Sequence, residues 1–150
     1  MPINVFLIDD DGDDRSLFSD AILQIDPGII INTAEDGETA MSRLENKEIK
    51  IPDIIFLDIN MPCKDGWACL SKLKAHPCYR EIPIIMYSTS SSASDIKKTQ
   101  HYGAVCLFTK PDNFEDMKDS LQIIIDLLKK KSLSSIPAMA SPWLLCYTNF

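Results

Sequence analysis

The sequence has few basic residues, and this shortage limits what the protein can bind. Lys and Arg number 15 against 22 Asp and Glu, which gives a formal net charge of −7. A nucleic-acid surface needs clustered Lys and Arg, and only the short run Lys129-Lys130-Lys131 gathers them. We interpret that run as a solvated helix end. No nucleic-acid partner is therefore expected.

Paired cysteines and long apolar runs are also missing. The five cysteines show no CxxC spacing, so neither a disulfide framework nor a zinc site is indicated. The first apolar run reaches Asp9 without the charged start and long core of a secretory signal. No run approaches the ~20 apolar residues of a membrane span. These absences predict a soluble, cytoplasmic protein with no membrane partner.

Short apolar runs alternate with longer segments of helical spacing, which is typical of a parallel sheet covered by helices on both faces. We expect strands near 3–9, 29–33, 53–58, 82–88 and 104–109, and helices near 13–26, 37–47, 65–75, 93–102 and 112–131. These units predict one α/β domain over residues 1–131 with an open, doubly wound sheet. Residues 132–150 are predicted to be a C-terminal tail that is flexible, or that docks on its own domain or on a partner.

Polar side chains follow the predicted strands at the edge where such sheets bind ligands. They are Asp9, Asp10 and Asp11 after the first strand, Asp58 after the third, Ser88 after the fourth and Lys110 after the fifth. Because the carboxyl ends of parallel strands meet at one edge, these side chains are predicted to form one small pocket. A hard divalent cation would neutralise the carboxylates, and Mg²⁺ is the usual choice where they share the ion with a phosphate.

Asp58 is the candidate nucleophile of this pocket because it ends the most apolar run, Ile54 to Leu57. A carboxylate that accepts a phosphoryl group needs a metal to spread the charge and fixed donors for the remaining oxygens. Ser88 offers a hydroxyl and Lys110 offers an ammonium. The pocket thus contains the parts for phosphorylation of an aspartate.

Four segments together resemble the receiver domain of bacterial two-component response regulators. They are Phe6 to Asp10, Leu57 to Gly66, Pro83 to Ser88, and Thr109 to Pro111. The resemblance covers residues 3 to 131 and implies a flavodoxin-like, five-stranded parallel sheet of order 2-1-3-4-5 with five helices. The expected type is a single-domain regulator of the chemotaxis or phytochrome-partner kind, or an intermediate carrier in a phosphorelay.

The resemblance implies a role for each carboxylate of the pocket. Asp58 would accept a phosphoryl group from a sensor histidine kinase or a histidine phosphotransfer protein, in a Mg²⁺-dependent reaction. The metal ligands would be Asp9, Asp10, Asp58 and the backbone carbonyl of Asn60. The protein would catalyse only its own phosphorylation and dephosphorylation, and would not otherwise be an enzyme.

Three further positions take their roles from the same resemblance. Ser88 would be the switch hydroxyl, and Lys110 would bind another phosphoryl oxygen. In the family a cis peptide bond joins this lysine to the next residue, here Pro111. Ser90 occupies a place that in the family tunes hydrolysis of the acyl phosphate. Leu107 departs from the pattern, since the family often has Tyr or Phe there to couple the switch to the surface.

No DNA-binding output domain is expected, so output should go through binding of a downstream protein. The resemblance implies that the partner would bind the face made by the helix over 93–102, the strand over 104–109 and the helix over 112–131. A homodimer is left open.

The remaining aspartates of the opening run are interpreted as parts of a turn and a helix start. Asp13 or Asp14 is expected to cap and charge the first helical turn. One alternative function is a haloacid-dehalogenase-like phosphatase using Asp9 and Asp11, because an Asp-x-Asp-Gly after an apolar strand resembles that family. That alternative lacks a later acidic pair and leaves Asp58 unexplained.

Overall fold

The computed structural model describes residues 2–61, 65–89, 92–130 and 143–145. Pro62, Ser90 and most of the predicted tail lie outside these described residues. The described strands are β1 (Asn4–Ile8), β2 (Ile30–Ala34), β3 (Ile54–Asp58), β4 (Ile84–Ser88), β5 (Cys106–Thr109) and β6 (Leu144–Leu145). The described helices are α1 (Gly12–Ile25), α2 (Gly37–Glu45), α3 (Gly66–Ala75), α4 (Ala93–His101) and α5 (Phe114–Lys129).

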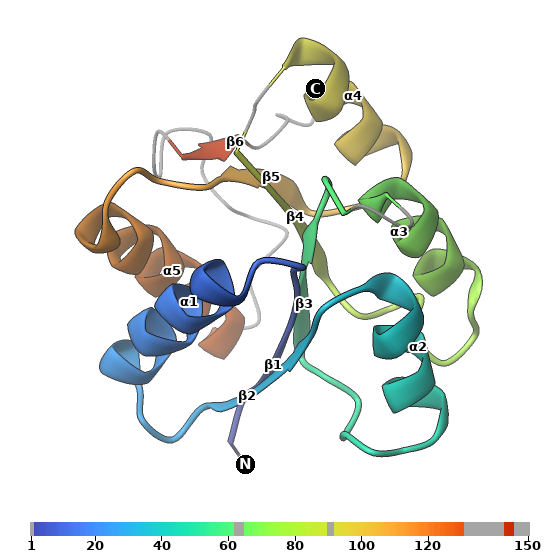
Figure 1. The fold of residues 1–150 in the computed structure, drawn as a ribbon, viewed down its shortest axis with the longest axis horizontal. Helices are drawn as coiled ribbons and strands as arrows, with labels where there is room; N and C mark the ends of the chain where they lie inside the picture. The colour runs from blue at the N-terminus through green and yellow to red at the C-terminus, as the bar shows by residue number, and fades with distance from the viewer. Residues whose placement is uncertain (1, 62–64, 90–91, 131–142, 146–150) are drawn as a thin grey trace.

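The sheet has its five parallel strands in the order β2-β1-β3-β4-β5, which confirms the predicted flavodoxin-like topology. Helices α1 and α5 cover one face, and α2, α3 and α4 cover the other (Figure 1). Each predicted strand and helix is present with ends shifted by a few residues. The carboxyl ends of the central strands therefore meet at one edge of the sheet, as the prediction of a pocket required.

Strand β3 forms the middle of the sheet because its side chains are apolar on both faces. All five of its residues are buried, and it pairs with β1 on one side and β4 on the other. Asp58 is the last residue of this strand, so its carboxylate lies at the edge of the sheet while still buried. Such a position is costly for a charge and favours a functional role.

Two apolar cores hold the helices against the two faces of the sheet. On the α2, α3 and α4 side, Leu57 and Leu107 pack among buried aliphatic side chains. On the α1 and α5 side, Phe18 meets Phe56 edge to face, with ring centroids 4.8 Å apart. Tyr87 also lies on this side, next to Phe18. No helix in the described part of the chain is long and apolar enough to cross a membrane.

Strand β6 extends the sheet beyond β5 in the antiparallel direction. The Thr109 N–H donates to the Trp143 carbonyl at 2.7 Å, and Leu144 is buried in the core beneath α5. Figure 1 shows this short strand alongside β5. No strand was predicted here, because two residues are too few to show a period.

Candidate functional site

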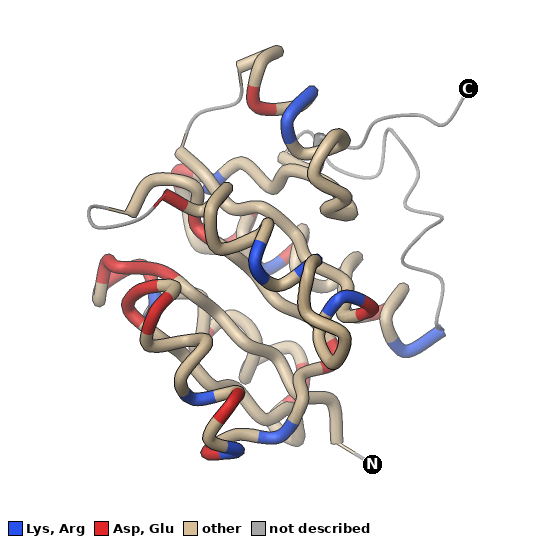
Figure 2. The backbone as a smooth tube through the Cα atoms, turned by 90° about the vertical axis from the view of Figure 1, so that its right-hand side faces the viewer, with Lys and Arg blue, Asp and Glu red and all other residues tan. Residues whose placement is uncertain are grey.

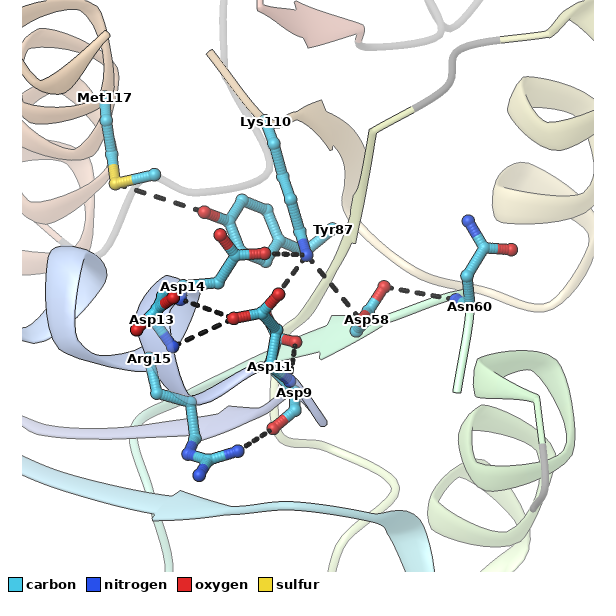
Figure 3. A network of polar contacts seen from close by, with 10 residues as sticks. All are labelled: Asp9, Asp11, Asp13, Asp14, Arg15, Asp58, Asn60, Tyr87, Lys110 and Met117. Atoms are coloured by element: carbon cyan, nitrogen blue, oxygen red, sulfur yellow. Dashed lines mark hydrogen bonds and ion pairs between the residues drawn. The ribbon is translucent and has the colours of Figure 1, made fainter. Parts of the chain in front are cut away.

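The predicted pocket residues meet at the carboxyl ends of four strands. Asp9 directly follows β1, Asp58 ends β3, Ser88 ends β4 and Lys110 directly follows β5. Figure 3 shows Lys110 extending over the ends of the strands toward Asp9 and Asp58. The backbone N–H of Lys110 donates to the Ser88 carbonyl at 2.7 Å, which ties the ends of β4 and β5 together.

The Lys110 ammonium lies among three carboxylates. Its Nζ is 3.1 Å from Oδ2 of Asp9, 3.6 Å from Oδ2 of Asp58 and 2.8 Å from Oδ2 of Asp14. The Lys110 side chain is only 10% exposed, so these pairs are shielded from solvent. The contact with Asp14 is the shortest, although that residue was not predicted to belong to the pocket.

Three aspartates of the pocket are placed to share a cation. Ligand oxygens of Asp9, Asp10 and Asp58 all lie within 4.8 Å of one another. Asp9 and Asp58 are buried, whereas Asp10 is exposed. Figure 2 shows acidic positions gathered at one edge of the molecule. This set of oxygen donors is of the kind that Mg²⁺ takes, and the residues present therefore fit the predicted ion.

The electrostatics of Asp58 support the same fit. Burial raises the pKa of this carboxyl to about 7, with a further increase from the Asp9 charge, against the opposing effect of Lys110. One ammonium therefore does not compensate the negative charge in the pocket. A divalent cation beside these carboxylates would favour their ionised form. The Asn60 N–H donates to Oδ1 of Asp58 at 3.1 Å, which places residue 60 beside the same carboxylate.

Tyr87 is a buried core residue whose ring lies next to the Lys110 ammonium, and it was not identified as a site residue from the sequence. The Lys110 Nζ lies 4.7 Å from the centroid of the Tyr87 ring. The Tyr87 hydroxyl contacts the Met117 sulfur at 4.0 Å. Burial of this phenol, together with the nearby Asp14, Asp9 and Asp58 charges, raises its pKa. The one feature of the sequence that could have pointed to Tyr87 is its place beside Ser88 at the end of an apolar strand. An ordinary core residue has the same pattern.

The start of α1 corrects one prediction. Asp11 caps this helix, because its Oδ1 accepts the N–H groups of Asp13 at 2.9 Å and Asp14 at 3.1 Å. The prediction that Asp13 or Asp14 is the cap was wrong, although both do charge the first turn. The Asp11 carboxylate therefore faces the helix backbone, which leaves the phosphatase alternative without its second carboxylate.

Two further expectations can be compared with the described residues. The peptide bond between Lys110 and Pro111 is trans, whereas the resemblance implied cis. Leu107 is fully buried in the core on the α2, α3 and α4 side, while its neighbour Phe108 packs against Tyr87 on the opposite side. Phe108 therefore does not take the place of the missing aromatic at position 107.

Comparison with known proteins identifies the family. The model of the response regulator receiver domain matches residues 5–122. The chain belongs to this family. Among its relatives is the response regulator Rcp1 of Synechocystis sp., which is 30% identical over 127 residues, covering 81% of this chain and 85% of that protein. The chain spans only 38% of another relative, a protein-glutamate methylesterase/protein-glutamine glutaminase of Rhodospirillum rubrum, with 33% identity.

Solved structures agree with the fold. The phosphorylated cyanobacterial phytochrome response regulator RcpA has a TM-score of 0.80 at 27% identity, with 87% of this chain and 96% of that chain covered. The Mn²⁺-bound form of Rcp1 has a TM-score of 0.73 at 26% identity, with coverage of 91% and 98%. Of these two proteins, RcpA is phosphorylated and Rcp1 is bound to Mn²⁺.

Proposed function

We propose that this protein is a receiver that accepts a phosphoryl group on Asp58 from a sensor histidine kinase or a histidine phosphotransfer protein. The observation that carries the proposal is the meeting of Asp58, Asp9 and Lys110 within one buried pocket. A buried carboxylate of raised pKa would be a poor feature for stability alone, but it suits a group that reacts. The protein would act on itself and on no other substrate.

In the proposed reaction an Asp58 carboxylate oxygen attacks the phosphorus of the donor phosphohistidine. A phosphorus–oxygen bond forms as the phosphorus–nitrogen bond breaks, and the electron pair of the broken bond returns to the donor imidazole. Lys110 can hold negative charge on a phosphoryl oxygen, and the Ser88 hydroxyl can donate to a second one. Ser88 ends β4, which pairs with β3, and Lys110 follows β5, the next strand along the sheet.

The reaction is proposed to require Mg²⁺. The ion would be held by Asp9, Asp10, Asp58 and the backbone carbonyl of Asn60. When bound, Mg²⁺ supplies positive charge that neutralises phosphoryl oxygens during transfer. Asp9 would also orient Lys110, since its Oδ2 accepts from Nζ while its Oδ1 accepts the Asp11 N–H at 3.0 Å.

The signal would leave the pocket through Ser88. The Ser88 carbonyl, at the end of β4, accepts the N–H of Lys110, which follows β5. A shift of Ser88 toward a phosphoryl group would therefore also move the end of β5. We propose that this changes the face made by α4, β5 and α5, where a cytoplasmic partner protein or a second copy of the chain would bind. Strand β6 pairs with β5 and so forms part of this face.

Phosphorylation by acetyl phosphate tests the proposal directly. With Mg²⁺, intact-protein mass spectrometry should show one phosphoryl group per chain, and EDTA should prevent it. Asp58→Asn should remove the labelling, whereas Asp20→Asn, an exposed position on α1, should not. Equal labelling of Asp58→Asn and the wild type would exclude Asp58 as acceptor. Onward transfer to a second histidine protein would indicate a phosphorelay carrier.

A further inference from the structure

Lys110 makes its shortest contact with a residue outside the predicted pocket. Its Nζ donates to Oδ2 of Asp14 at 2.8 Å and to Oδ2 of Asp9 at 3.1 Å, whereas Oδ2 of Asp58 is 3.6 Å away. Figure 3 shows the ammonium between Asp14 on one side and Asp58 on the other. In this arrangement the lysine hydrogen-bonds to the two carboxylates nearest α1 and only pairs electrostatically with the proposed acceptor.

We propose that Asp14 is a positioning residue that holds the Lys110 ammonium on the α1 side of the pocket and so slows phosphorylation of Asp58. This inference rests on the proposed function, because it concerns the rate of the same reaction. Asp14 would act through Lys110 and would not itself touch the phosphoryl group.

The local structure holds Asp14 in place for this contact. It lies in the first turn of α1, where its N–H is bound by the capping carboxylate of Asp11. The next residue, Arg15, donates through Nη1 to the Asp9 carbonyl at 2.7 Å, which fastens the same turn to the end of β1. A short side chain on a fixed backbone loses little conformational entropy when it binds, so the ion pair forms at low cost.

The charges around Lys110 explain why Asp14 can compete with Asp58. Carboxylate oxygens of Asp14, Asp9 and Asp58 lie 2.8, 3.1 and 3.6 Å from the Lys110 Nζ. An ammonium has only three N–H donors to share among them. A donor held by Asp14 is not free for a phosphoryl oxygen, where charge develops during transfer.

The neighbouring residue provides a matched control. Asp13 carries the same charge in the same helical turn, is exposed, and forms no ion pair with Lys110 among the described residues. Asp13→Asn therefore reproduces the loss of one negative charge near the pocket without releasing the lysine. Asp14→Glu provides a second control, because its carboxylate can still reach Lys110.

The experiment measures the rate of phosphorylation by acetyl phosphate and Mg²⁺ in the full chain. Asp14→Asn should raise the rate about three- to tenfold, as expected when one charge-assisted contact is released. Asp13→Asn and Asp14→Glu should stay within about twofold of the wild type. In a Lys110→Met background, where the reaction is slower, Asp14→Asn should have no more effect than Asp13→Asn.

The outcomes separate this inference from the proposed function. If the wild type is labelled but Asp14→Asn and Asp13→Asn change the phosphorylation rate equally, the positioning role of Asp14 is overturned. The proposed function would remain intact. A rate lowered by Asp14→Asn would also overturn it, because Asp14 would then assist the reaction. No labelling of the wild type would count against the proposed function itself. Thermal unfolding of each variant shows that the compared proteins are folded.

Discussion

A Cβ atom on residue 66 would lie 2.3 Å from the Asp58 carbonyl oxygen and 2.8 Å from the Cα of Ile59. Gly66 begins α3, and its N–H donates to the Ile59 carbonyl at 2.8 Å, so the helix start is pressed against the end of β3. Both obstructing atoms belong to the backbone and cannot rotate away. Only glycine lets α3 begin this close to the proposed acceptor.

Gly66→Ala should therefore destabilise the protein by about 3 kcal/mol and slow Asp58 labelling, because the end of β3 must move. Urea unfolding and mass spectrometry measure the two effects. Gly12→Ala is the control: a Cβ there meets only an Arg15 side-chain nitrogen at 3.5 Å, and α1 should be unchanged or stabilised by about 0.5 kcal/mol. Equal effects of the two substitutions would contradict the steric argument.

The raised pKa of Asp58 predicts how stability depends on pH. The pKa rises from 3.8 to about 7, chiefly through burial, so between these pH values the folded protein binds more protons than the unfolded chain. The free energy of unfolding should then fall as pH rises from about 4 to about 7. Asp58→Asn lacks this titration and should be more stable than the wild type above pH 7.

We expect the gain to be about 1–2 kcal/mol, less than the whole pKa shift would give, because Asp58→Asn also removes the ion pair of Asp58 with Lys110. Urea unfolding of both proteins between pH 4 and 8, in EDTA to remove metal, measures the difference. The two stability curves should converge toward pH 4. Curves that run parallel over the whole range would show that Asp58 titrates as an ordinary surface carboxyl.

Sequence patterns predicted the sheet and its ligand-binding edge because apolar runs define strands and their carboxyl ends follow directly. They could not predict the ion pair of Asp14 with Lys110, since the two residues are 96 positions apart and the contact depends on how α1 is rotated. Which aspartate caps α1 depends on the N–H groups that its carboxylate reaches. A shift of one or two residues in the start of the helix changes the answer. Helix starts are the least certain part of such predictions for this reason.

The exposed ligand of the proposed metal site predicts a change in ion affinity. Asp10 is exposed, whereas Asp9 and Asp58 are buried, so Asp10→Asn should remove a charge without disturbing the core. We expect Mg²⁺ affinity to fall at least about tenfold, since a direct ligand should matter no less than groups that merely support ligands. Asp13→Asn, in the exposed first turn of α1, should change it less than about twofold.

Trp67 can report this binding. It follows Gly66, which lies against the Asp58 backbone, and its ring stacks on Tyr102 with centroids 5.8 Å apart. Titration of Mg²⁺ into a Trp143→Phe background should change the fluorescence of Trp67. The prediction is wrong if Asp10→Asn and the wild type titrate at the same Mg²⁺ concentration.

The contact of β6 with β5 predicts a stability effect that does not depend on the aspartates of the pocket. Leu144 is 1% exposed and pairs in register with Phe108, so Leu144→Ala removes buried apolar surface. We expect the free energy of unfolding to fall by about 2 kcal/mol. The loss cannot exceed the free energy that holds β6 on the sheet, because β6 can detach and leave the edge of β5 open. Leu17→Ala, at a position 46% exposed, should cost about 0.5 kcal/mol or less.

Hydrogen exchange distinguishes detachment of β6 from loosening of the whole domain. The Thr109 N–H donates to the Trp143 carbonyl, so its exchange should accelerate in Leu144→Ala. The N–H of Ile59, which donates to the Tyr87 carbonyl between β3 and β4, should remain protected. Protection of Thr109 equal to that in the wild type would mean that β6 stays attached without Leu144. Exposure of both amides would instead mean that β6 supports the domain as a whole.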